Sequence, residues 1–258
     1  GVFDTGFHHT MPDYVYTYAI PKEYYDKYRI RRYGFHGTSH RYVSERAIDL
    51  LGRGKEGTRI VTCHLGNGAS LAAVKDGKCF DTTMGVTPLE GIMMGTRCGS
   101  IDPAIITYLM RKGELNTPDD IDKMMNKRSG MLGVSGISSD NQVICKGADE
   151  GDERCELVVK MYTHQLTKLV GGYIAAMGGV DAIVFTGGIG ENTARYRADL
   201  CENLAFLGIK VDPEKNKIRG EEIDISTPDS PIRVYVIPTN EELVIARDTL
   251  AIVNNLNK

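Results

Sequence analysis

The sequence predicts an α/β fold on the basis of three observations. Residues 60–81 contain three short strand-like runs, separated by a Gly-rich bend and an Asp-Gly turn. Residues 181–185 form a buried-strand pattern, and a Gly-rich segment and a helical pattern follow it. Residues 153–177 carry apolar side chains at the three-and-four spacing of a long core helix. Strands that alternate with helices are typical of α/β proteins, and 258 residues suffice for one large domain or two small ones.

The composition indicates a globular protein and excludes two classes of partner. The chain is 41% hydrophobic and 25% charged, with a net charge of −3. That charge gives no footprint for nucleic acid, and no apolar run is long enough to span a membrane. The six cysteines lack C-x-x-C spacing, so we expect reduced thiols and a cytoplasmic location, and neither a nucleic acid nor a membrane as a partner.

The first residues suggest a chain that starts inside a larger fold. Residues 1–5 have the pattern of a strand end and the turn after it. Asp4 at this strand end suits a metal or a catalytic role, and a turn-capping role explains it equally well. We expect the tyrosine-rich residues 7–33 to form a loop and short helices that pack on the domain.

A Gly-punctuated segment leads into a helix predicted for residues 42–51, with Thr38 or Ser39 as its cap. His36 and His40 then lie beside the positive end of the helix, where anions are favoured. A lone histidine is usually structural. Two histidines within five residues, beside a glycine bend, favour contact with a substrate phosphate.

The strand-like runs at residues 60–63 and 71–74 flank the bend that contains His64 and Asn67. Glycines on both sides of Asn67 allow the backbone to approach a ligand and to direct N–H groups at an anion. An ordinary β-turn without a ligand is the alternative. Asp76 and Gly77 predict a tight hairpin turn, because a type I′ turn needs positive φ at both central residues.

Glycines interrupt residues 81–103, so we expect a long functional loop there. Arg97 lies between two of these glycines, and its guanidinium binds oxyanions in a bidentate manner. Pro88, Leu89 and Met94 are expected to form an apolar wall beside it. A charged arginine beside a small apolar pocket suits a small carboxylate or an acyl phosphate, whereas a surface arginine is the alternative.

The remaining elements complete the α/β pattern. Helices are predicted at residues 103–112, 118–127, 195–204 and 243–253, a strand at 232–238 and a loop at 129–141, with Asp102 and Asn240 as caps. The strand at 181–185 and the glycines after it form a phosphate cradle that differs from the dinucleotide and P-loop motifs, and it fits a mononucleotide. Glu241, at the start of the last helix, serves the helix dipole or reaches a magnesium ion through water.

Taken together, these segments resemble the acetokinase family. The matching segments are VFDTGFHHTMP (2–12), YGFHGTSHRYVSERA (33–47), CHLGNGAS (63–70), DTTMGVTPLEGIMMGTRCGSIDP (81–103), GISSD (136–140), FTGGIGEN (185–192) and PTNEELVIARDT (238–249). The resemblance implies the actin-like superfamily, whose two ribonuclease H-like lobes, each a mixed sheet flanked by helices, close on a nucleotide. It implies that residues 5–240 form the C-terminal lobe, that 1–4 are the end of a largely absent N-terminal lobe, and that 241–258 form a helix that packs on that lobe.

The resemblance also implies an activity, which is reversible phosphoryl transfer between ATP and acetate to give acetyl phosphate and ADP. Magnesium or manganese would assist, and the family forms homodimers through this lobe. This chain alone is expected to be inactive, because half of the cleft is missing. Kinases of the family that act on propionate or butyrate are one alternative, and a non-catalytic nucleotide-binding or dimerisation lobe is another.

Family roles carry over to the residues that match. The catalytic matches are Asp4 with magnesium, His36 at the transferred phosphoryl group and Arg97 at acetate. The matches for phosphate and adenosine binding are His64, Asn67, Gly68, Asp140, Gly187, Gly188, Ile189, Gly190 and Asn192. Phe35 and Pro88 match the walls of the acetate methyl pocket, and Glu241 matches a magnesium-associated glutamate.

The sequence departs from the family pattern at two places. Gln142 stands where the family usually has an arginine that stacks on adenine, and it follows Asn141. Base affinity or specificity is therefore expected to differ. Cys98 and Ser100 replace the usual serine and aspartate of the GTRSGD run.

Overall fold

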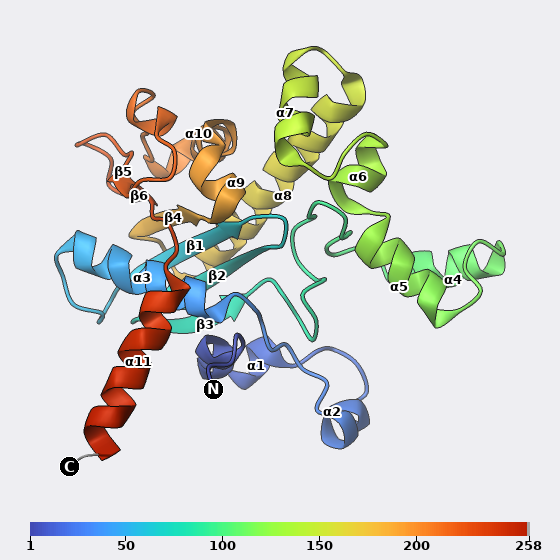
Figure 1. Ribbon diagram of the computed structural model, residues 1–258, viewed down its shortest axis with the longest axis horizontal. Helices are drawn as coiled ribbons and strands as arrows, with labels where there is room; N and C mark the ends of the chain where they lie inside the picture. The colour runs from blue at the N-terminus through green and yellow to red at the C-terminus, as the bar shows by residue number, and fades with distance from the viewer. Residues whose placement is uncertain (257–258) are drawn as a thin grey trace.

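A mixed six-stranded sheet with helices on both faces forms the centre of the molecule (Figure 1). The structure is a computed structural model, and it describes residues 1–256. The strands are β1 (Arg59–Leu65), β2 (Ala69–Lys75), β3 (Lys78–Thr82), β4 (Ala182–Thr186), β5 (Ile223–Asp224) and β6 (Arg233–Val236). They lie in the order β3-β2-β1-β4-β6-β5, with β1, β4 and β6 parallel and the others antiparallel to their neighbours. The predicted α/β class is confirmed.

Helices surround this sheet. They are η1 (Gly6–Thr10), α1 (Asp13–Tyr16), α2 (Lys22–Tyr28), α3 (Gly37–Leu51), α4 (Ala104–Arg111), α5 (Pro118–Lys127), α6 (Gly130–Ser135), α7 (Asn141–Asp149), α8 (Glu153–Met177), α9 (Gly187–Asn192), α10 (Ala194–Asn203), η2 (Ala205–Leu207), η3 (Lys215–Lys217) and α11 (Glu241–Leu256). The predicted spans of α5 and α8 are confirmed at both ends. Residues 257–258 of the expected terminal helix lie outside the described residues.

Alternating side chains of β1 pack on the two faces of the sheet. Val61, Cys63 and Leu65 join the large core that α8 covers. Ile60 joins the smaller core on the α3 face, together with Val43. Thr62 and His64 have the same parity as Ile60, so their polar side chains point towards α3. This alternation places a polar cluster between α3 and the sheet.

The hairpin between β2 and β3 has the predicted turn. Asp76 has φ 55° and Gly77 has φ 70°, as a type I′ turn requires. Of the two predicted caps, Asn240 lies directly before α11, whereas Asp102 lies one residue outside the cap position of α4, which Pro103 occupies. Asp102 accepts a hydrogen bond from the backbone N–H of Ala104 at 2.9 Å, and Asn240 accepts one from Leu243 at 3.0 Å.

The expected cap of α3 is wrong. Neither Thr38 nor Ser39 caps this helix, which begins earlier, at Gly37. His36 precedes it in the left-handed conformation, with φ 56° and ψ 29°. The carboxylate of Asp4 accepts hydrogen bonds from the N–H groups of His36 at 2.7 Å and Gly37 at 3.1 Å. A residue that is distant in sequence therefore supplies the cap.

Residues 129–141 are not a loop, because α6 forms within them and α7 begins at their end. The first N–H groups of α6 are satisfied by another segment: Met131 donates to the carbonyl of Met94 at 2.9 Å, and Leu132 donates to that of Gly95 at 3.0 Å. Met94 and Gly95 belong to the loop between β3 and α4, called here the 83–103 loop. Because the support comes from this distant loop, the periodicity of residues 129–141 did not reveal the helix.

The glycine segment after β4 is helical, not a turn, since Gly187 begins α9 directly. Gly187 has φ 77°, and a β-carbon there would lie 2.8 Å from the carbonyl oxygen of Leu65. Glycine is needed for this close approach to β1. The expected strand end at residues 1–5 is also wrong in part. Residues 4–5 form a turn, but residues 1–3 pair with no strand in the described part of the chain.

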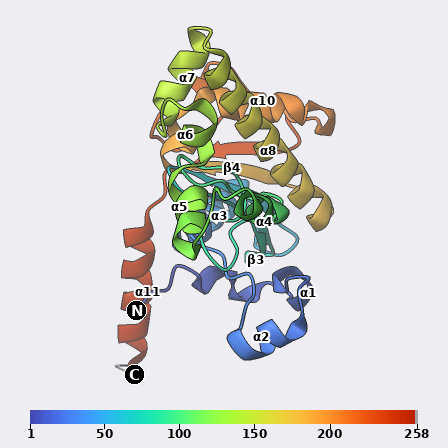
Figure 2. The same ribbon diagram turned by 90° about the vertical axis from the view of Figure 1, so that its right-hand side faces the viewer.

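The terminal helix α11 extends away from the sheet and contacts α3 (Figure 2). Val244 is its one buried residue within residues 241–256. Within residues 1–256, no helix combines the length and apolar character that crossing a bilayer requires. All six cysteines are free thiols, as expected, and four of them are buried.

Arg197 on α10 is a fully buried guanidinium that joins three segments. It donates to the carbonyls of Gly190 and Glu191 at 2.8 and 2.9 Å, at the end of α9. It also donates to the side chain and backbone of Asn216, at 2.7 and 2.6 Å, and to the carbonyl of Ile218 at 3.2 Å. Burial lowers the pKa of Arg197 to about 10, and the partial negative charge at the C-terminus of α9 offsets part of this cost.

We expect Arg197→Met to lower the free energy of unfolding by about 3 kcal/mol or more, because several buried carbonyls lose a charged donor. Urea denaturation measures this change. The control is Arg195→Met, whose partly exposed ion pair with Asp149 contributes about 0–1 kcal/mol. If Arg197→Met lowers the free energy of unfolding no more than the control does, the hydrogen bonds of Arg197 do not stabilise the fold as proposed.

Candidate functional site

The start of α3, the bend after β1 and the 83–103 loop meet at Gly68. A β-carbon on Gly68 would lie 3.3 Å from Nη1 of Arg97 and 3.5 Å from Nε2 of His36. Nη1 of Arg97 and Nε2 of His36, two residues predicted for the site, therefore converge on one point of the backbone. Only glycine leaves room there for a ligand atom between an imidazole and a guanidinium.

His36 is held in an uncommon backbone conformation. A positive φ at a residue other than glycine is rare and is kept only where its surroundings support it. Asp4 provides that support from one side through the backbone. On the other side, Nδ1 of His36 lies 2.8 Å from Oγ of Ser70, and its ring stacks on His64 with centroids 4.2 Å apart. These contacts leave Nε2 to face Gly68.

Three further histidines lie behind His36 in the polar cluster on the α3 face. His8 contacts the Phe35 carbonyl at 2.9 Å, and His64 contacts Oγ of Ser39 at 2.8 Å. Burial lowers the pKa of His8 to about 4 and that of His64 to about 3. Burial also lowers the pKa of fully buried His40 well below its usual value. At neutral pH these imidazoles are uncharged.

The pKa of His36 is also lowered by burial, and the charge of Asp4 opposes this while that of Arg97 adds to it. Arg97 donates from Nη1 to the carbonyl of Pro88 at 3.0 Å and lies 3.6 Å from Sδ of Met94. Pro88 and Met94 thus lie beside the guanidinium as expected. Leu89 lines a separate cavity together with Cys98.

A polar cleft of about 770 Å³ opens between α7, α9 and the bend after β1. The predicted residues that line it are Asn67, Asp140, Gly188, Ile189 and Asn192. The side chain of Asn67 lies against Gly95, where a β-carbon would be 2.3 Å from its Oδ1. The lining residues come from four segments that are far apart in the sequence, which are residues 66–67, 139–149, 188–193 and 219.

Other predicted residues do not line this cleft. Gly187 and Gly190 are buried, and they pack α9 closely on β1. His64 lies beneath the ring of His36, and Gly68 faces Arg97. Their positions support the cleft without forming its wall.

Residues 140–142, which include the position where the sequence differs from the family pattern, have different roles. Asp140 caps α7 by accepting from the N–H of Gln142 at 2.8 Å. Asn141 is buried and joins α7 to α10, through Thr193 at 3.1 Å and Tyr196 at 2.9 Å. Gln142 is exposed and lines the cleft. Both residues line the cleft, but the side chain of Asn141 is engaged within the protein, whereas that of Gln142 is exposed.

The sequence did not predict three charged residues of the cleft, which are Lys146, Asp149 and Arg219. Lys146 lies on α7, which was not expected. Arg219 lies in the irregular segment between η3 and β5, where no sequence pattern marks a functional position.

Burial and the charge of Asp4 both raise the pKa of Glu241. Within residues 1–256, no group of three or more potential ligands is arranged as a metal site. A pair of carboxylates still fits magnesium, which commonly binds through one or two carboxylates while water and substrate phosphates complete its shell.

Phe35, predicted for the wall of the methyl pocket, is half-buried directly before His36 and packs against the large core.

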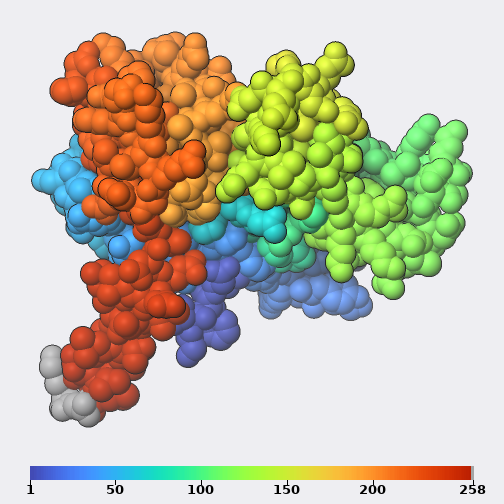
Figure 3. All heavy atoms as spheres, turned by 45° about the horizontal axis from the view of Figure 1, so that its top comes forward, coloured from blue at the N-terminus to red at the C-terminus, as the bar shows by residue number. Residues whose placement is uncertain are grey.

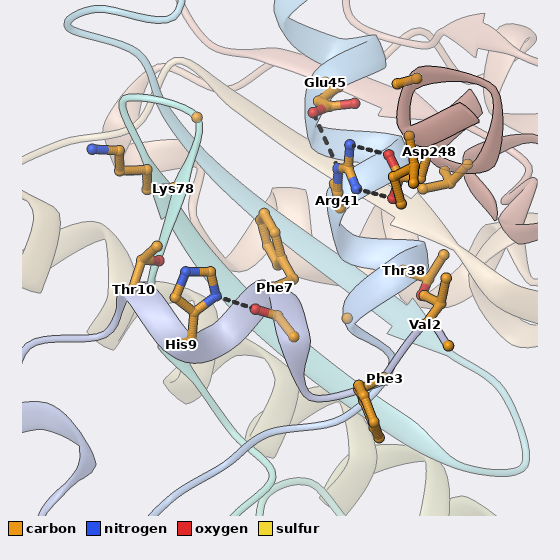
Figure 4. Close-up of a pocket in the computed structure, with 17 residues that line it drawn as sticks. Val2, Phe3, Phe7, His9, Thr10, Thr38, Arg41, Glu45, Lys78 and Asp248 are labelled. Carbon is orange, nitrogen blue, oxygen red and sulfur yellow. Dashed lines mark hydrogen bonds and ion pairs between the residues drawn. The ribbon is translucent and has the colours of Figure 1, made fainter. Parts of the chain in front are cut away.

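A second cleft of about 530 Å³ lies between residues 1–10, α3 and α11 (Figure 4). Arg41 on α3 forms two hydrogen bonds to the carboxylate of Asp248 on α11, at 2.7 and 3.0 Å. Val2 and Phe3 at its edge are 47% and 77% exposed. Figure 3 shows α11 projecting from the body beside the first residues of the chain. Neither His36 nor Arg97 lines this cleft.

We expect the free energy of unfolding to decrease as the pH falls from 7 to 5. In the unfolded chain His8 and His64 titrate near 6.5, but in the folded protein they do so only near 4 and 3. The unfolded state therefore binds protons that the folded state does not. Stability is retained above pH 6.5 and is lost as the pH falls towards the folded values, by about 2 kcal/mol per histidine at pH 5.

Urea denaturation at the two pH values measures this effect. His8→Gln should make the pH dependence shallower, whereas His9→Gln, at an exposed position, should leave it unchanged. Equal free energies of unfolding at pH 7 and pH 5 would show that these imidazoles are not buried in the uncharged form.

Comparison with known proteins adds an independent line of evidence. The sequence model of the Acetokinase family matches residues 1–247. The acetate kinase of Phocaeicola vulgatus is 57% identical over 254 residues, which are 98% of this chain and 64% of that protein. The crystal structure of Porphyromonas gingivalis acetate kinase superposes with a TM-score of 0.95 at 51% identity, and it covers 98% of this chain and 63% of that one.

A propionate kinase from Francisella tularensis superposes with a TM-score of 0.88 at 45% identity, covering 95% of this chain and 62% of that one. These similarities confirm the expected actin-like lobe. The chain spans less than two thirds of the length of the relatives that it matches.

Proposed function

This chain belongs to the acetokinase family, and from that premise we propose that it serves reversible phosphoryl transfer between ATP and acetate, giving ADP and acetyl phosphate. The observation that supports this most strongly is the convergence of His36 Nε2 and Arg97 Nη1 on Gly68. This point adjoins the polar cleft, because Asn67 beside it lines that cleft. A carboxylate held at Arg97 would then face a phosphate held between the bend and α9.

The chemistry proposed for this site is direct in-line transfer. The attacking carboxylate is already ionised and needs no general base, so positioning and electrostatic stabilisation supply most of the catalysis. Arg97 would bind the acetate oxygens, and Nε2 of His36 would contact the phosphoryl group as it moves. Asn67 and the backbone N–H groups of Gly188 and Ile189, which line the cleft, would hold the nucleotide phosphates. Magnesium or manganese held by Asp4 and Glu241 would neutralise charge on these phosphates when bound.

The nucleoside is proposed to lie between α7 and α9. Asp140 and Ile189 line this part of the cleft, and Gln142 lies on the same wall. An amide offers both a donor and an acceptor, whereas an arginine offers only donors. We therefore propose that Gln142 contacts the base by hydrogen bonding and not by cationic stacking.

Phe35 and Pro88 are proposed to enclose the methyl group of acetate. Propionate is a second candidate acceptor, because a propionate kinase is 45% identical to this chain and has the same fold. One methylene changes binding by only about 1–3 kcal/mol, so relative rates on acetate, propionate and butyrate are needed to separate the acids.

We propose that residues 5–240 form one lobe of a two-lobed enzyme and that residues 1–4 and 241–258 belong with the other lobe. Exposed apolar side chains support this on both segments, including Phe3 and Leu250. On this proposal the chain alone has no turnover, the complete enzyme is a homodimer joined through this lobe, and it acts in the cytoplasm.

We expect Arg97→Ala to lower the rate of the two-lobed enzyme by about 10²–10³, because one pre-positioned charged donor is lost. ATP formation from acetyl phosphate and ADP measures the rate. Arg111→Ala, at an exposed position on α4, is the control and should keep it. Near-normal turnover of Arg97→Ala would contradict the assigned role, and no turnover in the unmodified two-lobed enzyme would contradict the proposed function.

We also expect the 258-residue chain to bind Mg-ADP in calorimetric titration. Gly188→Asp should weaken binding by at least about tenfold, because it places a negative charge where the phosphates would lie. A β-carbon at Gly188 meets no atom within 4 Å, so neither Gly188→Asp nor the neutral control Gly188→Ser strains the backbone by contact. Equal binding by the two variants would place the phosphates elsewhere.

A further inference from the structure

A buried series of hydrogen bonds lies behind His36. Oγ of Ser70 lies 2.8 Å from Nδ1 of His36 and 2.7 Å from Nε2 of His40. Nδ1 of His40 lies 2.8 Å from Oγ1 of Thr62, which in turn lies 3.3 Å from the carbonyl oxygen of Ala72. Thr62, His40 and Ser70 are fully buried, so solvent does not provide alternative partners.

The serine hydroxyl constrains both imidazoles that it joins. A hydroxyl has a single hydrogen, so Ser70 can donate to only one of the two ring nitrogens. In the described part of the chain no third group lies within hydrogen-bond distance of its buried Oγ, so accepting from both nitrogens would leave the hydroxyl hydrogen without a partner, and we expect Ser70 to donate to one and accept from the other. If His40 carries its hydrogen on Nδ1, Ser70 donates to His40 and accepts from Nδ1 of His36. If His40 carries it on Nε2, Ser70 accepts from His40 and donates to Nδ1 of His36. The neutral rings therefore have the same tautomer in either case.

The two arrangements differ at Nε2 of His36, the ring nitrogen that faces Gly68. In the first, Thr62 donates to Ala72 and His36 presents a bare Nε2. In the second, Thr62 donates to His40 and His36 presents an Nε2–H group, with the same number of ring hydrogens. A phosphoryl oxygen accepts hydrogen bonds, so only the second arrangement lets an uncharged His36 stabilise it. The second arrangement gives up only the bond to Ala72, whose length of 3.3 Å marks it as weak.

We propose that Ser70 and His40 are positioning residues that direct Nε2 of His36 towards Gly68 and Arg97 and couple the tautomers of the two histidines. The link to phosphoryl transfer rests on the proposed function, whereas the coupling rests on the contacts of Ser70 alone. Ser70 touches only the side of His36 that faces away from Gly68, so it acts through His36 and not on the substrate.

Long-range ¹H–¹⁵N correlation spectra of the ¹⁵N-histidine-labelled 258-residue chain test the coupling at neutral pH, without substrate. His36→Gln and His40→Gln variants assign the signals. We expect His36 and His40 to carry the ring hydrogen on the same nitrogen, either Nδ1 in both or Nε2 in both. Opposite tautomers would overturn the proposal. The unmodified chain decides this, so the test does not depend on whether a variant folds.

Ser70→Ala should change the ring-nitrogen signals of both His36 and His40. His8 is an internal reference, because its Nε2 faces the carbonyl of Phe35 at 2.9 Å and must carry the hydrogen. The matched control is Ser39→Ala, which removes the hydroxyl bonded to His64 and should change the signals of His64. If the ring-nitrogen signals of His36 are unchanged in Ser70→Ala, the Ser70 hydroxyl does not link His36 to His40.

Kinetics of the two-lobed enzyme test the link to function. Ser70→Ala should lower kcat by about tenfold or more with little change in KM for acetate, and Ser70→Thr, which keeps the hydroxyl, should restore most of it. A normal kcat in Ser70→Ala would overturn the positioning role in an enzyme that is active. If the unmodified enzyme transfers no phosphoryl group, the proposed function fails, and the spectra still decide the coupling.

Discussion

The two hydrogen bonds that Asp4 accepts from the first N–H groups of α3 hold the site together. They cap a helix N-terminus, where a negative charge is favoured, and they keep His36 in its left-handed conformation. That conformation turns the imidazole towards Gly68 and Arg97. Burial and the charge of this same carboxylate raise the pKa of Glu241, at the beginning of α11.

Glycines determine the shape of the site as much as its functional side chains do. Gly68 leaves the space between His36 and Arg97, and Gly95 leaves the space that Asn67 fills. Behind these positions, uncharged imidazoles occupy a region where hydrocarbon would otherwise be expected. A buried neutral imidazole has one donor and one acceptor, so it can be fully hydrogen-bonded without the cost of burying a charge. The polar cluster is thus rigid and compatible with the core.

Sequence analysis succeeded where local chemistry decides the structure. The Asp76-Gly77 turn and the spans of α5 and α8 follow from φ preferences and apolar spacing, and all three are confirmed. It failed where a distant segment decides. Backbone carbonyls of the 83–103 loop support α6, and contact with β1 allows α9 to begin at Gly187.

The site shows the same division between local and distant determinants. Arg97 and His36 stand in distinctive glycine-rich segments and were proposed from the sequence alone. Ser70 lies within a regular strand, where it looks like any β-sheet residue, and its contacts with two histidines appear only once α3 packs on the sheet. Arg219 lies in an irregular segment without a pattern. Residues that work through packing or through an irregular backbone leave no periodic signal.

The attachment of α11 has a consequence for the order in which the molecule opens. This helix is held to the body by buried Val244 and by the ion pair between Arg41 and Asp248, whose side chains are 37% and 31% exposed. Salt screens such a pair, and one buried apolar side chain stabilises a helix only weakly. Amide hydrogens of α11 should therefore exchange with solvent long before those of α8 or β1, and sooner still at high ionic strength. The helix that starts beside the site thus detaches while the core behind His36 stays folded.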